Sequence, residues 1–108
     1  MQWYNSIMDI TKKIQGNKLE IEKFSNENAI NFIGLFGSYA RGEENNDSDL
    51  DLLVKFDFSK KNIGMFELFK LQKTLENMFG KKVDIVTNPN KLFQPYIEKD
   101  LKIIYERR

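Results

Sequence analysis

Short apolar segments of strand length, separated by stretches with helical spacing, are the feature that most restricts the fold of this chain. Apolar and aromatic residues run together over residues 30–36, 50–56 and 83–87, and Gly37 ends the first run. Runs of this length are typical of buried β-strands. Between the second and third runs, residues 63–79 repeat apolar side chains at helical spacing and end before a glycine. Strands separated by helices predict an α/β or α+β sandwich with a small sheet.

Further helices are expected near both ends of the chain and after the first strand. The length of 108 residues predicts one domain over residues 1–108, with residues 1–28 as an N-terminal helical extension. The pattern leaves open whether residues 102–105 are helical or form a strand. The expected helices are residues 4–15 with Ile7, Ile10 and Ile14 on one face, residues 18–28, one or two turns within residues 38–43, and a last helix from Pro95 that carries Ile97, Leu101 and Ile104.

The composition excludes several kinds of chemistry, because the chain has no Cys and no His. Thiol nucleophiles, disulfides, zinc sites built on Cys or His, and Ser-His-Asp catalysis are all ruled out. Lys plus Arg number 17 and Asp plus Glu number 16, so a whole-surface electrostatic interaction with nucleic acid is not expected. No apolar run reaches the roughly 20 residues that cross a bilayer, and the N-terminal sequence does not resemble a signal peptide. The expectation is therefore a cytoplasmic protein with no membrane partner.

Two carboxylates lie two residues apart in the second predicted strand. Asp49 and Asp51 alternate with Leu50 and Leu52, so a strand would place both carboxylates on one face. Two ionised carboxylates held together repel each other unless a positive group lies between them. Oxygen ligands favour a divalent hard cation such as Mg²⁺, Mn²⁺ or Ca²⁺. The alternative interpretation of this pair alone is a solvated start of a strand.

The turn after the first predicted strand has features that favour phosphate. Gly37 allows close approach to the backbone, and Ser38 opens a predicted helix whose first N–H groups are free to donate. Arg41 could reach a phosphate or pair with an acidic residue. The alternative is structural: Gly37 as a turn, Ser38 as a helix cap and Arg41 in a surface ion pair.

Taken together, the two motifs predict a site for a nucleoside triphosphate with bound metal. Asp84, in the third predicted strand, is an acid among apolar residues, where an unpaired charge is costly. It either forms a salt bridge, with Lys81 or Lys82 as candidates, or completes the metal site. Beside the other two motifs, the metal site is the favoured interpretation.

The spacing of these residues resembles the signature of the DNA polymerase β-like nucleotidyltransferase superfamily. Gly37-Ser38 is followed by ten residues and then by Asp49-Leu50-Asp51. The fuller string is similar to the minimal nucleotidyltransferases of bacteria and archaea, and the resemblance extends from about residue 33 to residue 105. It implies a mixed sheet flanked by helices and the following site: Asp49 and Asp51 as catalytic metal ligands, Asp84 as the third carboxylate, and Gly37 and Ser38, with Arg41 nearby, as nucleotide-binding residues.

The same resemblance implies a reaction and a partner. Minimal nucleotidyltransferases of this type are often paired with a HEPN-domain toxin, an RNase, and transfer AMP from ATP to a tyrosine of that toxin. The expected substrate is then ATP, the expected cofactor is two Mg²⁺ ions, and the expected assembly is a hetero-oligomer with the toxin. Two alternatives remain: an antitoxin that neutralises its partner by binding alone, and, disfavoured by the short chain, an enzyme that adenylylates a small molecule. Ile63, Met65, Phe66 and Phe69 could form an exposed docking surface or fill the core.

Overall fold

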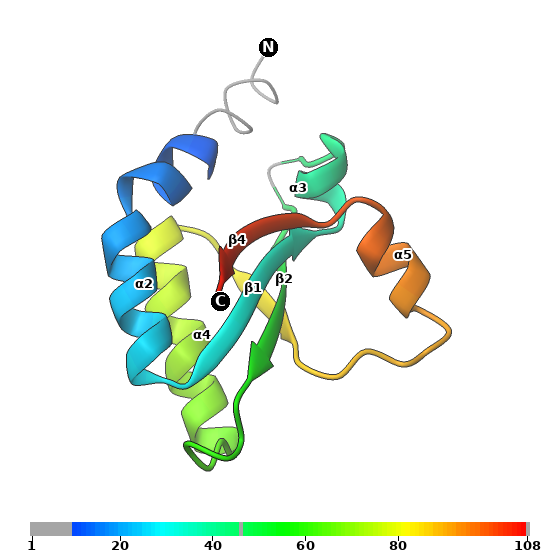
Figure 1. Ribbon diagram of the computed structural model, residues 1–108. Helices are drawn as coiled ribbons and strands as arrows, with labels where there is room; N and C mark the ends of the chain where they lie inside the picture. Colours follow the sequence, from blue (N-terminus) through cyan, green and yellow to red (C-terminus); the bar gives the residue numbers. More distant parts are fainter. Residues whose placement is uncertain (1–9, 46, 108) are drawn as a thin grey trace.

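The computed structural model describes residues 10–45 and 47–107, and its centre is a four-stranded mixed sheet with the strand order β3-β2-β1-β4. Strand β1 runs antiparallel to both β2 and β4, whereas β2 and β3 are parallel. Figure 1 shows α2 and α4 side by side, with α5 on the other side of the sheet. The elements are α2 (Lys18–Glu27), β1 (Ile30–Phe36), α3 (Ser38–Arg41), β2 (Leu50–Phe56), α4 (Met65–Phe79), β3 (Val83–Val86), α5 (Gln94–Lys99) and β4 (Lys102–Glu106).

The sheet has a different hydrophobic core on each face. The larger core joins α2 and α4 to alternate residues of the strands, such as Leu52 and Val54. The smaller core lies under α5, where Ile97 packs with Phe32 and Leu53. Because side chains alternate along a strand, Asp51 shares the α5 face with Leu53. The helix pair therefore packs on one face of the sheet, and Asp51 lies on the other.

The predicted architecture is confirmed, with differences at the ends of elements. Residues 4–9 of the first predicted helix lie outside the described part of the chain, while residues 10–16 are helical. The long helix begins at Met65 rather than at residue 63, because the Gly64 N–H donates to the Glu67 carboxylate at 2.9 Å and caps the helix there. The third strand ends at Val86 instead of residue 87.

The last predicted helix is shorter than expected, and the open question about residues 102–105 is decided in favour of a strand. Helix α5 ends at Lys99, so Leu101 lies beyond it and Ile104 belongs to strand β4. The physical reason is the open edge of β1, whose backbone groups pair with β4 from Phe32 to Leu35. Pairing satisfies backbone hydrogen bonds that a longer helix would leave unmade at that edge. Within the residues that the structure describes, no helix is long and apolar enough to cross a membrane.

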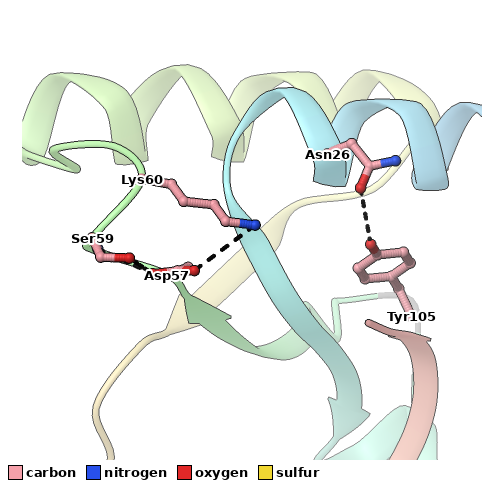
Figure 2. A network of polar contacts seen from close by, with 5 residues as sticks. All are labelled: Asn26, Asp57, Ser59, Lys60 and Tyr105. Carbon is pink, nitrogen blue, oxygen red and sulfur yellow. Dashed lines mark hydrogen bonds and ion pairs between the residues drawn. The ribbon is translucent and has the colours of Figure 1, made fainter. Parts of the chain in front are cut away.

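Polar contacts hold the end of β2 that lies away from Asp51 (Figure 2). After β2, the Asp57 carboxylate accepts hydrogen bonds from the Ser59 N–H and hydroxyl and lies 4.0 Å from the Lys60 ammonium. The Tyr105 hydroxyl donates to the Asn26 side chain at 3.4 Å and links β4 to α2. These contacts fix turns and edges and place no group near the other end of the strand.

Gly34 is a buried position where added volume should cost stability. A Cβ at this residue would lie 2.6 Å from Leu101 Cδ1 and 2.7 Å from Phe32 Cε1. We expect Gly34→Ala to lower the free energy of unfolding by about 1–3 kcal/mol, because both side chains would have to move. Urea unfolding measures this loss of stability. An unchanged midpoint would show that the smaller core accommodates the added methyl group without a loss of stability.

Candidate functional site

The acidic residues of the predicted site gather at one end of the sheet. Asp51 and Asp84 are direct partners in the parallel pairing of β2 with β3, so their side chains emerge on the same face. Asp49 precedes β2 by one residue. On the other side of β2, Asp51 pairs with Phe36, the last residue of β1. The strand pairing therefore brings the carboxylates beside the turn that begins at Gly37.

Gly37 is required at this turn by both conformation and space. Its φ of 78° lies in the left-handed region, which other residues rarely adopt. A Cβ at residue 37 would also overlap the Asp51 carboxylate. The Asp51 side chain thus packs directly against the backbone from which α3 begins. Helix α3 is a single turn that ends at Arg41, and the next residue, Gly42, also has a positive φ.

Asp51 is the electrostatically strained member of the group. Burial raises the pKa of the half-buried Asp51 carboxyl, and repulsion from Asp84 and then Asp49 raises it further, while the Arg41 charge opposes the rise. Asp49 and Asp84 are themselves exposed. Arg41 forms an ion pair with Glu43 at 3.2 Å, as the structural alternative for this residue proposed, and still acts on Asp51 through its charge.

The three carboxylates offer the oxygen donors that a hard divalent cation takes, but the structure does not hold them around one point. Among residues 10–45 and 47–107, no group of three or more acidic side chains lies in ligand geometry. Repulsion among ionised carboxylates keeps them apart when no cation lies between them. Asp51 carries that repulsion from both neighbours, and a cation would relieve it. Oxygen donors of this kind are the ligands that Mg²⁺ takes in proteins.

We expect Asp51→Asn to raise the melting temperature at neutral pH, because the substitution removes a half-buried charge that Asp84 and Asp49 repel. The folded protein binds the Asp51 proton more tightly than the unfolded chain, whose pKa is near 3.8. Ionisation of Asp51 therefore lowers the free energy of unfolding as the pH rises through the raised pKa of this residue, and the loss persists at neutral pH. The gain should vanish near about pH 3, where both states hold the proton.

Differential scanning fluorimetry with and without Mg²⁺ tests this expectation. Mg²⁺ should raise the melting temperature of the wild type and have a much smaller effect on Asp51→Asn. A lower melting temperature of the variant at neutral pH would contradict the repulsion that we infer for Asp51.

A cavity of about 500 Å³ opens on the α5 face beside Gly37 and Arg41. Phe36 and Val86 form part of its lining; Phe36 pairs with Asp51, and Val86 pairs with Leu53, which places the cavity next to the carboxylates. Among the residues that the structure describes, no acidic side chain lines this cavity. Five further lining residues follow β3 and were not predicted from the sequence: Asn88, Pro89, Asn90, Phe93 and Tyr96. The Asn- and Pro-rich stretch after β3 was the signal that could have indicated them.

Asp49 and Asp84 line two separate and smaller cavities. Asp49 shares a cavity of about 410 Å³ with Ser48, Lys81 and Lys82. Asp84 lines a cavity of about 220 Å³ with side chains of α4. Neither Lys81 nor Lys82 forms a salt bridge with Asp84 among the residues that the structure describes, so the salt-bridge alternative for Asp84 finds no support.

Comparison with protein families matches residues 17–108 to the family described as Polymerase beta, Nucleotidyltransferase. A candidate protein adenylyltransferase of Methanocaldococcus jannaschii is 40% identical over 74 residues, which are 68% of this chain and 71% of the relative. The protein adenylyltransferase MntA of Thermococcus cleftensis is 34% identical over 82 residues, covering 75% and 76% of the two chains.

Solved structures with this fold include a candidate minimal nucleotidyltransferase, with a TM-score of 0.68 and 26% identity over 84% of this chain and 92% of that one. A toxin–antitoxin complex with AMP-PNP gives a TM-score of 0.66 at 22% identity, covering 85% and 75% of the chains. A tri-AMPylated HEPN toxin of Shewanella oneidensis in complex with its MNT antitoxin gives 0.60 at 21% identity, covering 86% and 72%. The last two likenesses concern the fold alone.

Proposed function

The chain belongs to the polymerase beta nucleotidyltransferase family, and from this premise we propose that it transfers AMP from ATP to a tyrosine hydroxyl of a HEPN-domain toxin and so acts as an antitoxin. The observation that carries the proposal is the register of β2 with β3, which sets Asp51 beside Asp84 at the Gly37 turn. The names of the relatives support protein adenylylation, and one similar structure contains an AMPylated HEPN toxin. We also propose that residues 1–108 act as one catalytic unit.

In the proposed site, Asp49, Asp51 and Asp84 would hold Mg²⁺. The bound metal neutralises charge on the phosphates and lowers the pKa of the attacking hydroxyl. The raised pKa of Asp51 supports this assignment, because after burial its causes are the charges of Asp84 and Asp49. Two ions, as the family resemblance implies, form part of the proposal.

The chain's own residues would orient the triphosphate and move the proton. The first N–H groups of α3, at Ser38, lack partners within the helix and would donate to the β- and γ-phosphates. Arg41 lies one turn further along and would add positive charge. The tyrosine oxygen would bond to the α-phosphorus as the bond to pyrophosphate breaks. Asp84 would accept the tyrosine proton, since it is exposed and reachable by an acceptor.

The nucleoside would occupy the 500 Å³ cavity between the Gly37 turn and α5. Its volume lies within the range of small-molecule sites, and its apolar and aromatic lining with a few amides suits a purine. Phe93 and Tyr96, both largely exposed, could stack on the base, and Asn88 and Asn90 could hydrogen-bond its edge. This placement leaves the triphosphate directed at the carboxylates.

A second function, neutralisation of the toxin by binding alone, is favoured by one observation. Met65, Phe66 and Phe69 are exposed on α4 rather than packed in the core. An apolar surface of this kind serves an interaction whether or not a reaction follows.

Incubation with labelled ATP, Mg²⁺ and the HEPN-domain protein encoded by the neighbouring gene separates the two functions. Catalysis predicts label on a tyrosine of that protein, and loss of the label with Asp51→Asn. If Asp51→Asn neutralises the RNase fully and no label forms with either chain, binding alone explains the activity. ATP labelled at the γ-phosphate is the matched control, because AMP transfer releases that label with pyrophosphate.

A further inference from the structure

We propose that Met65, Phe66, Phe69, Lys70 and Lys73, here called the α4 patch, form the docking surface for the protein that carries the acceptor tyrosine. The proposal rests on the adenylyl transfer proposed above and adds the side from which the acceptor arrives. The exposed fractions of the three apolar side chains are 84%, 69% and 56%. Such large apolar side chains grouped on one helix indicate an interaction site.

The patch borders the edge strand that carries Asp84. Met65 and Phe69 line a cavity of about 220 Å³ together with Asp84 and Thr87. Asp84 lies on β3, which is an edge strand of the sheet. An acceptor seated on the α4 patch would therefore lie at this edge of the sheet, whereas the nucleotide cavity lies on the α5 face beside Gly37. The two substrates would approach the carboxylates from different sides.

Side chains of α4 also hydrogen-bond to backbone groups at the edge of β3. The Gln72 side chain donates to the Val83 carbonyl at 2.8 Å, and the Val83 N–H donates to the Glu76 carboxylate at 3.0 Å. Residues 65, 69, 72 and 76 follow one stripe of the helix. The stripe thus covers the start of β3 with polar groups and leaves apolar side chains next to the rest of the strand.

The positive charge of the α4 patch indicates the kind of partner that it binds. The Lys70 ammonium lies 5.1 Å from the centre of the Phe66 ring, and the Lys73 ammonium lies 5.4 Å from the centre of the Phe69 ring. Lys73 also pairs with Glu76 at 3.4 Å, but Lys70 has no ion pair among the described residues. A second copy of this chain packed on the patch about a twofold axis would bring its lysines towards these lysines. An acidic surface with apolar residues fits better, so we assign the patch to a partner protein of that chemistry.

The test compares Phe66→Ala/Phe69→Ala with the control Leu19→Ala, which removes an apolar side chain that is 79% exposed on α2. Isothermal titration calorimetry with the neighbouring HEPN-domain protein should show more than about tenfold weaker binding for the double variant and less than about twofold change for the control. Label transfer should fall by the same factor at low partner concentration and recover at saturating concentration, because the carboxylates are unchanged. Melting temperatures verify that each variant folds.

Lys70→Glu tests separately whether the positive charge of the patch contributes to binding. It should weaken binding by more than about threefold, with a smaller effect at high salt. Unchanged binding by the double variant would overturn the proposal. The proposal would also be overturned if the only effect of the double variant were a loss of self-association, since the patch would then join copies of this chain. If the wild type binds its partner without transferring label, the proposed reaction fails, while the binding data still decide the role of the patch.

Discussion

Replacing Asp51 by asparagine should slow AMP transfer by about 10² or more, which corresponds to roughly 3 kcal/mol or more of activation free energy. Asp51 is the carboxylate that packs on Gly37 and is paired in register with Asp84, so it stands at the centre of the proposed metal site. Asparagine keeps the size of the side chain and removes the negative charge. Asp49→Asn should have an effect of the same order.

Label transfer at saturating ATP measures this effect. Asp57→Asn is a matched control, because Asp57 lies at the opposite end of β2 and its side chain contacts Ser59 and Lys60 of the following turn. If Asp51→Asn kept turnover close to that of the wild type, the assignment of the metal to these carboxylates would be wrong. Since the same variant should melt at a higher temperature at neutral pH, a loss of activity through unfolding is distinguishable from a loss of the charge.

Gly37→Ala should reduce transfer by about tenfold or more and lower the unfolding free energy by about 1–3 kcal/mol. The added methyl group would face a positive φ and the Asp51 carboxylate together. The carboxylate would have to leave its position, and the turn that begins α3 would shift with it. Activity should therefore fall even under conditions where the variant is folded.

Gly16→Ala is the matched control for this substitution. Gly16 lies in the helical segment of residues 10–16, and a Cβ there would meet no atom within 4 Å. Alanine should stabilise this position by about 0.5–1 kcal/mol. Thermal unfolding together with label transfer compares the two variants. Wild-type activity and stability in Gly37→Ala would contradict the close packing of Asp51 on the turn.

The sequence was sufficient to predict the first three strands, because their apolar runs are short and end at distinctive residues. Residues 30–36 and 50–56 form β1 and β2 with the predicted bounds. The side-by-side position of Asp51 and Asp84 follows once β2 and β3 pair in parallel, a pairing that local spacing cannot reveal. The roles of these residues in metal and nucleotide binding stay predictions.

The misplaced features depend on tertiary structure. Leu101 and Ile104 continue the spacing of a helix, yet β4 forms because the edge of β1 offers backbone partners. Phe93 and Tyr96 border the cavity only because α5 lies across the sheet from α2 and α4 (Figure 1). The apolar residues at the start of α4 could equally have filled a core, and only the packed structure shows that Met65, Phe66 and Phe69 face solvent.

The hydrogen bonds from Gln72 and Glu76 to Val83 have a consequence for how this protein can assemble. With those backbone groups already satisfied, a foreign strand cannot extend the sheet at the start of β3 by main-chain pairing, which would accept almost any sequence. A partner that binds at this edge must then be recognised through side-chain contacts. One genome could therefore encode several such enzymes whose partners are kept separate by a handful of surface substitutions.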